Sequence, residues 1–218
     1  MGEPVVRNTG RGAVDDAPRS MRDAGVRERR KAMLGLPHVA KLSTFAAKLR
    51  ERGSVEVPEF DPLDGGIDAR VLFLFEKPGP MTSTGGKRPG SGFISRNNDD
   101  PTAKAIFHFM EEAAIPRKST VTWNVIPWWN GTVKVTGAEL SEGVDHVVDL
   151  IGLLPNLRAV VMVGLKAAAA KPYLETTGLA LFTSDHPSPL VRARWPSRWK
   201  AIPSEWAKVR TYIGEEGK

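Results

Sequence analysis

The stretch Ala69-Arg70-Val71-Leu72-Phe73-Leu74-Phe75 is the first of four short apolar runs that decide the fold. The other three occupy residues 120–126, 159–164 and 179–183. Most of these runs are nearly continuous in apolar residues, whereas a strand with one wet face alternates between apolar and polar positions. Continuous runs of this length are typical of strands that are covered on both faces of a parallel sheet. We therefore expect four buried strands.

Helical patterns lie between and around these runs. Apolar spacing near 3.6 residues predicts helices over residues 102–114, 139–153, 165–174 and 203–213. A similar pattern over residues 27–52 predicts two more helices, because Pro37 interrupts it. Residues 55–66 contain two prolines and a glycine pair and are predicted to form a surface crossing loop. This alternation favours an α/β fold, a three-layer α/β/α sandwich around a four-stranded, mainly parallel sheet.

Length and composition bound the remaining possibilities. With 218 residues, of which 41% are hydrophobic and 26% charged, the chain is of globular type. We expect a single domain over residues 25–218 and a mobile basic N-terminus over residues 1–24, which lack an apolar period. The absence of cysteine excludes disulfides, thiolate catalysis and Cys-ligated zinc or iron–sulfur clusters. No apolar run is long enough for a membrane span, and the four histidines share no metal-ligand spacing, so neither membrane nor metal is expected.

Positive charge is concentrated in two places. Residues 1–52 carry 12 basic and 6 acidic side chains, which accounts for the whole net charge of +6. A second basic stretch with interleaved tryptophans follows Pro189. Basic patches favour a polyanionic partner such as nucleic acid, because they neutralise phosphates. A solvated helix face with a basic tail is the alternative explanation.

The chemistry is expected at one edge of the predicted sheet. In open α/β sheets, ligands bind outside the carboxyl ends of the strands. Polar or proline-rich residues follow three of the four predicted strands, at residues 76–80, 124–129 and 184–190. The fold prediction and the composition therefore indicate the same edge.

The residues at this edge carry a family resemblance. His186-Pro187-Ser188-Pro189-Leu190 resembles the third motif of the uracil-DNA glycosylase superfamily, and Glu76-Lys77-Pro78-Gly79 resembles its first motif. Phe93 resembles the aromatic residue that stacks on the extruded uracil, and Asn124 the asparagine that binds the pyrimidine edge. The order and spacing match over roughly residues 68–213. Two features depart from the family pattern: Lys77 stands where many members have Asp or Asn, and the cysteines of the iron–sulfur branch are missing. The chain thus resembles a divergent, cluster-free member.

The resemblance implies a role for each of these residues. His186 would stabilise the departing base anion, although a histidine that caps a buried loop is the alternative. Asn124 can donate and accept hydrogen bonds at once, as the uracil edge requires; its alternative is to satisfy loop backbone. Phe93 would stack on the base or anchor its loop in the core. Glu76 and Lys77 would lie against the substrate, and a salt bridge that ties the loop is the alternative for Glu76.

A substitute is needed for the missing acid of the first motif. Asp100-Pro101-Thr102-Ala103 resembles the acidic step that some relatives use near this point, so Asp100 is the candidate that positions the attacking water. The alternative is structural, because Asp followed by Pro is a frequent helix start.

The segment after His186 is the candidate DNA-binding segment. In the family, the residue at the position of Leu190 can enter the space that the extruded base leaves, where an apolar side chain offsets the loss of stacking. Arg192 and Arg194 would hold flanking phosphates, and Ser188 would contact phosphate from the proline-rigidified backbone.

The resemblance implies a DNA glycosylase that removes uracil, or other deaminated bases, in base-excision repair. It implies no cofactor, uracil-containing DNA (single- or double-stranded) as partner, a monomer, and a bacterial cytoplasmic setting. The alternative is a protein that binds uracil-containing DNA with little or no turnover, because the first-motif acid is missing. A fold reused on RNA or on a free nucleoside is a further alternative.

Overall fold

The computed structural model describes residues 15–51, 53, 55–85 and 89–214. At its centre lies a four-stranded parallel sheet with the strand order β4-β2-β5-β6. These strands are β2 (Val71–Phe75), β4 (Thr120–Asn124), β5 (Ala159–Val163) and β6 (Ala180–Ser184). Each coincides with one of the four apolar runs, and every pairing between them is parallel.

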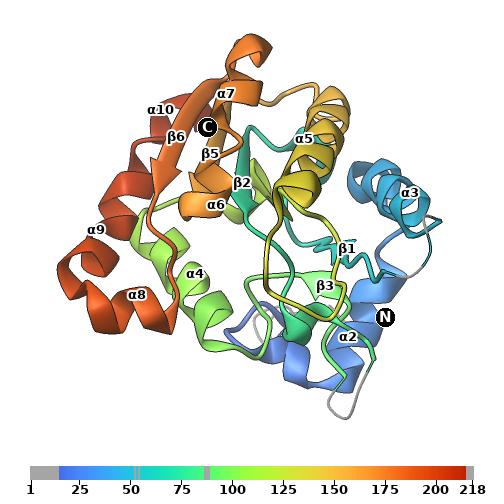
Figure 1. Ribbon diagram of the computed structural model, residues 1–218. Coiled ribbons are helices and arrows are strands. Elements are labelled where there is room, and N and C mark those ends of the chain that lie inside the picture. The colour runs from blue at the N-terminus through green and yellow to red at the C-terminus, as the bar shows by residue number, and fades with distance from the viewer. Residues whose placement is uncertain (1–14, 52, 54, 86–88, 215–218) are drawn as a thin grey trace, which may run out of the picture.

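Helices cover both faces of this sheet (Figure 1). Leu72 and Leu74 point into a core shared with α3 (Pro37–Arg50) and α5 (Gly137–Gly152). Phe73 and Phe75 point to the opposite face, which α4 (Pro101–Glu112), α9 (Pro196–Ala207) and α10 (Arg210–Ile213) cover. Successive side chains of a strand face opposite sides, so an apolar residue is needed at every position. The predicted three-layer α/β/α fold is confirmed.

Short elements complete the described chain. The helices are α2 (Ala24–Ala32), α6 (Leu165–Ala168), α7 (Lys171–Leu174) and α8 (Pro189–Arg194); the 3-10 turns are η1 (Ser20–Arg22), η2 (Gly66–Asp68), η3 (Pro80–Thr82), η4 (Arg117–Ser119) and η5 (Glu175–Thr177). Two-residue strands β1 (Glu59–Phe60) and β3 (Phe93–Ile94) pair in parallel as a separate small sheet. Among the described residues, none of the helices combines the length and apolarity that crossing a membrane requires.

Two helix predictions are wrong in their boundaries. The expected helix over residues 165–174 is divided into α6 and α7, where Pro172 lies in the first turn of α7. The expected start at Pro203 lies inside α9, because Pro196 occupies the first turn instead. Proline fits the first turn of a helix, where its missing N–H leaves no hydrogen bond unmade.

The predicted surface loop over residues 55–66 is also wrong, because much of it is buried. Phe60 is 1% exposed and stacks on Trp123 with ring centroids 3.7 Å apart. Asp61 and Asp64 are buried as well. The prolines and glycines of this segment therefore shape an interior crossing.

The prediction of a mobile N-terminus over residues 1–24 is wrong for residues 15–24. Residues 1–14 lie outside the described residues, whereas residues 15–24 are built into the fold. The Met21 side chain is 2% exposed, and its backbone N–H donates to the carbonyl oxygen of Asn97 at 3.0 Å. Asp16 forms an ion pair with Arg117. Tertiary contacts thus hold residues 15–24 in place, although their sequence shows no periodic spacing of apolar residues.

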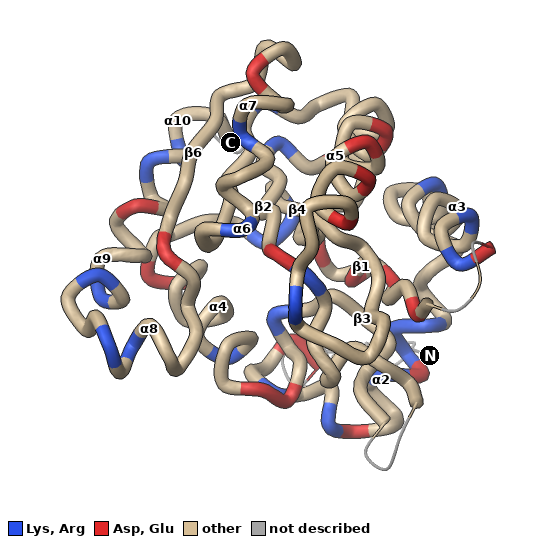
Figure 2. Tube along the Cα trace, in the orientation of Figure 1, with Lys and Arg blue, Asp and Glu red and all other residues tan. Residues whose placement is uncertain are grey.

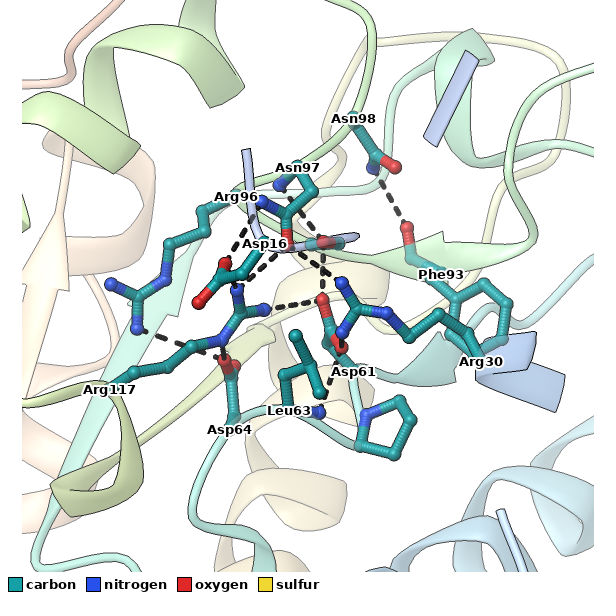
Figure 3. A network of polar contacts seen from close by, with 12 residues as sticks. Asp16, Arg30, Asp61, Leu63, Asp64, Phe93, Arg96, Asn97, Asn98 and Arg117 are labelled. Atoms are coloured by element: carbon teal, nitrogen blue, oxygen red, sulfur yellow. Dashed lines mark hydrogen bonds and ion pairs between the residues drawn. The ribbon is translucent and has the colours of Figure 1, made fainter. Parts of the chain in front are cut away.

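A buried charge network lies where β4 begins (Figure 3); it consists of Arg30, Asp61, Asp64, Arg96, Asn97 and Arg117. Arg117 donates to Asp61 at 2.6 Å and to Asp64 at 2.9 Å. Arg30 donates to Asp61 at 2.9 Å. Burial opposes ionisation of Asp61, but Arg117 and Arg30 outweigh it and lower the pKa of this carboxyl. The network joins α2 to the segment that precedes α4.

Candidate active site at the carboxyl ends of the strands

His186 lies two residues beyond the end of β6 with an imidazole that makes few polar contacts. Its ring meets that of Phe75 edge to face, with centroids 5.9 Å apart. The backbone carbonyl of His186 accepts a hydrogen bond from the N–H of Ser188 at 2.8 Å, which turns the chain sharply. Neither ring nitrogen hydrogen-bonds to any described residue. The half-buried imidazole is therefore held in place by packing, and its nitrogens are without a hydrogen-bond partner in the described part of the chain.

The protonation of His186 is set by burial and by two carboxylates. Burial lowers the pKa of the imidazole, while Glu76 and then Asp100 oppose this shift and Lys166 adds to it. The net direction is downward. This shift favours the neutral imidazole, which can donate one hydrogen bond as an uncharged group.

Glu76 follows β2 and approaches the start of α6. Its carboxylate accepts from the backbone N–H of Lys166 at 3.5 Å and lies 3.8 Å from the Lys166 ammonium. Gly164 makes this approach possible: a Cβ there would lie 2.8 Å from Glu76 Oε1 and 3.3 Å from His186. The backbone of Gly164 has φ +93°, which also favours glycine. Glu76 therefore forms, beside the imidazole, the loop-tying contact that is the alternative to its predicted role against the substrate.

Asp100 is the N-cap of α4, and among the described residues only one of its carboxylate oxygens has a partner. Oδ1 accepts from the N–H groups of Thr102 and Ala103 at 2.8 and 2.9 Å. Oδ2 makes no hydrogen bond or ion pair with any described residue. Burial raises the pKa of this carboxyl, although the two N–H groups oppose the shift. A rigidly held carboxylate with one free oxygen and raised proton affinity is suited to accept a proton.

Asn124 is the last residue of β4 and pairs in register with Phe75. Register partners of parallel strands point to the same face, so the Asn124 side chain lies on the side of the sheet that carries Phe75 and α4. The side chain is buried, and its Nδ2 has no hydrogen-bond partner among the described residues. A buried amide without a hydrogen-bond partner lowers the stability of the fold, so Nδ2 is a donor that an acceptor from a ligand could satisfy. Asn124, Asp100, Glu76 and His186 together are called the His186 site below.

Lys77 does not join this site. Its ammonium donates to Glu139 at 2.7 Å, to Asn130 at 2.8 Å and to the Lys134 carbonyl at 3.2 Å, which uses all three N–H groups. Burial opposes ionisation of Glu139, but hydrogen bonds from Lys77 and the Thr136 backbone outweigh it and lower its pKa to about 2. The prediction that the Lys77 side chain contacts substrate is wrong, because it clamps the loop after β4 to α5.

Phe93 is the buried anchor that the sequence offered as its alternative. The side chain is 1% exposed and packs with Met21 and Val26. The expected stacking on an extruded base is therefore wrong for this ring. Its surface is covered by Met21, which lies in the segment predicted to be mobile, and by Val26 of α2.

The segment after His186 forms α8 and leads into α9. Ser188 is the N-cap of α8 and its hydroxyl accepts from the Val191 N–H at 3.4 Å. Leu190 is 70% exposed. The guanidinium groups of Arg192 and Arg194 lie over Trp199 and Trp195, with 5.0 and 4.9 Å to the ring centroids. Basic residues gather along α8 and α9 (Figure 2).

The sequence patterns assigned no role to two residues that contribute to the site. Gly164 provides the space in which Glu76 and His186 meet, and Lys166 holds the Glu76 carboxylate. The available signal was a glycine between an apolar strand and a helix, which often marks close backbone approach. In the described part of the chain, no group of three or more His, Cys, Asp or Glu side chains is arranged to hold a metal ion.

No protein-family model matches the sequence, and no curated protein is similar enough to it to count as a relative. The resemblance to the uracil-DNA glycosylase superfamily therefore rests on the quoted motifs and stays a hypothesis.

Proposed function

We propose that this protein is a DNA glycosylase that hydrolyses the N-glycosidic bond of uracil in DNA. One observation carries the proposal. An imidazole, a carboxylate oxygen and an amide nitrogen that have no hydrogen-bond partner among the described residues come from three segments to the same edge of the sheet, at His186, Asp100 and Asn124. Of these three groups the Asn124 amide nitrogen is buried, and buried polar groups are normally satisfied, so its unmet hydrogen bond favours a ligand that completes it.

The chemistry of each group fits this bond cleavage. As the N1–C1′ bond breaks, its electron pair leaves with the base, and negative charge develops on the uracil oxygens. A neutral imidazole at His186 donates to the O2 oxygen. The lowered pKa supports this role, because an imidazolium would carry charge before the reaction begins.

Asn124 supplies the recognition of the base. Its free Nδ2 donates to O4 of uracil, and its carbonyl oxygen accepts from N3–H. Cytosine presents a donor at C4 and an unprotonated N3, so the same amide orientation leaves two mismatched contacts. A site that pairs a buried polar group with its substrate rejects analogues strongly, because the mismatch leaves that group unpaired.

Asp100 completes the hydrolysis. Water attacks C1′ of the oxocarbenium-like sugar and passes its proton to Oδ2, while Oδ1 stays bound to the helix N-terminus. The products are the free base and an abasic site. Because Lys77 is fully bonded, no free lysine amine is provided there for strand cleavage.

The test is excision from a labelled oligonucleotide with a single uracil, single- and double-stranded, in EDTA, followed by alkali to reveal abasic sites. His186→Ala and Asp100→Asn are each expected to lower the single-turnover rate by at least about 100-fold, in line with general acid–base and anion-stabilising roles. Asparagine is as good an N-cap as aspartate, so Asp100→Asn removes the base and keeps the helix start.

Matched controls are His108→Ala and Asp99→Asn, whose side chains are 51% and 36% exposed. Both are expected to keep wild-type rates. If the wild type leaves uracil attached but binds uracil-DNA selectively, the protein is the non-catalytic binder that the sequence left open. If Asp100→Asn excises uracil at the wild-type rate, Asp100 serves only as the cap of α4.

A further inference from the structure

Two leucines project into solvent from segments that contact His186. Leu165 is 83% exposed and begins α6, directly after Gly164. Leu190 is 70% exposed and lies four residues beyond His186. Leu165 has the larger exposed fraction, and neither the fold nor the proposed chemistry of the His186 site uses its side chain.

The two segments lie side by side at the carboxyl edge. The N–H of Gly164 donates to the Ser184 carbonyl at 2.9 Å, and the position of a Cβ on Gly164 would be 3.3 Å from His186. Leu165 is therefore the residue directly after the one that approaches the imidazole, and its side chain projects into solvent. In Figure 1, α6 lies beside the connection that runs from β6 to α8. The two leucines are thus carried by two chain segments that both pass next to His186.

Cationic side chains accompany both leucines. Lys166 follows Leu165 with its side chain 47% exposed, and Arg192 and Arg194 follow Leu190. An exposed apolar side chain next to phosphate-binding cations matches a nucleic acid, in which charge surrounds stacked apolar bases.

We propose that Leu165 is a second wedge for duplex DNA, an inference that rests on the proposed function. Extrusion of a base from a duplex leaves a gap in one strand and an unpaired base in the other. Leu190 fills the gap, and Leu165 contacts the adjoining base step from the opposite side of His186. In a single strand there is no partner base to hold, so Leu165 contributes only where a complementary strand is present.

The experiment compares Leu165→Ala, Leu190→Ala and wild type on one uracil sequence presented single-stranded, opposite guanine and opposite adenine. Leu165→Ala is expected to slow single-turnover excision from the uracil–adenine duplex roughly tenfold, because unstacking and unpairing are hardest there. The loss is smaller opposite guanine, where the mismatch weakens pairing, and absent on the single strand. Val148→Ala, an exposed apolar residue on α5, is the control and keeps wild-type rates.

A second readout separates the wedge from the chemistry. 2-Aminopurine placed opposite or beside the uracil becomes brighter when its step is unstacked, with or without excision. Wild-type protein is expected to raise this fluorescence, and Leu165→Ala to lose most of the rise. Equal loss of excision on single and double strands, or an unchanged fluorescence rise in Leu165→Ala, overturns the second wedge.

The two proposals fail in different ways. If the wild type forms no abasic sites but a Leu165-dependent fluorescence rise persists, the glycosylase proposal fails and the wedge remains in a binding protein. If wild type excises uracil and Leu165→Ala matches it on every substrate, the wedge fails and the glycosylase remains. If the wild type gives neither excision nor a fluorescence rise, both fail.

Discussion

Asn97 and Asn124 are both buried asparagines, and they differ in how many of their hydrogen bonds are made. Asn97 lies in the buried charge network, where Oδ1 accepts from Arg117 at 2.7 Å and Nδ2 donates to the Ala17 carbonyl at 2.9 Å. Asn124 lies at the His186 site, and its Nδ2 has no partner among the described residues. Buried polar groups rigidify a fold when they are satisfied, and they cost stability when they are not. The comparison separates a structural polar cluster from a candidate functional one.

The largest expected effect tests the buried charge network, in which the hydrogen bonds of Asn97 are made. Asp61 accepts from Arg30, Arg117 and Ser95, the last at 2.5 Å, while its side chain is 0% exposed. Asp61→Asn removes the charge that two buried guanidinium groups share. We expect the free energy of unfolding to fall by about 3–5 kcal/mol, as for other broken buried ion pairs.

Urea denaturation followed by tryptophan fluorescence measures this loss. Asp145→Asn, an exposed aspartate on α5, is the control and should stay within about 0.5 kcal/mol of wild type. A loss below about 1 kcal/mol in Asp61→Asn would mean that the network contributes no more than a surface ion pair.

The next prediction applies the same substitution to both asparagines. Asn97→Leu leaves Arg30, Arg117 and the Ala17 carbonyl short of a partner, so we expect a loss of about 3 kcal/mol in the free energy of unfolding. Asn124→Leu removes an amide whose Nδ2 already lacks a partner among the described residues, so stability should be unchanged or higher by about 1 kcal/mol. Uracil excision should be lost in Asn124→Leu.

Urea denaturation curves and excision assays on Asn97→Leu and Asn124→Leu measure both the stability and the activity of each variant. Equal destabilisation of both would show that Asn124 is satisfied in solution and that its free donor is not kept for a ligand. Full excision by Asn124→Leu would remove this residue from base recognition.

The sequence predicts the sheet well and the site only in part, and the reasons differ. Phe73 and Leu72 face opposite cores, so burial on both faces leaves a continuous apolar run that local sequence reveals. The buried crossing over residues 55–66 leaves no such pattern. Asp61 and Asp64 are buried only because arginines distant in sequence neutralise them.

The wrong site assignments share a cause. A motif fixes a residue's position along the chain, but not the direction of its side chain. Phe93 turns toward Met21 and Val26, whose segment had no apolar period to predict its docking. Lys77 is bound by Glu139, which lies 62 residues further on. The placement of His186 beyond β6 was predictable because β6 itself was, and the chain turns immediately afterwards.

The smallest expected effect is a shift in the titration of His186, and it tests whether the unsatisfied groups act on one another. Burial lowers the pKa of this imidazole below its ordinary value of 6.5, and the Asp100 carboxylate opposes that shift by stabilising the imidazolium. Asp100→Asn removes the negative charge, so the pKa of His186 should fall further. The imidazole Cε1–H resonance, followed by NMR across pH, measures both values, with Asp99→Asn as the control that leaves His186 unchanged.

The sign of this shift has a consequence for activity. If neutral His186 is the active form, excision by the wild type is lost only as the pH falls below 6.5 and the imidazole takes up a proton. Residual excision by Asp100→Asn should then persist to lower pH than in the wild type, because its imidazole resists protonation longer. An unchanged pKa of His186 in Asp100→Asn would place the two groups too far apart to act on one substrate. If Asp100→Asn lowers both the pKa of His186 and the pH at which excision is lost, Asp100 and His186 act together in one site.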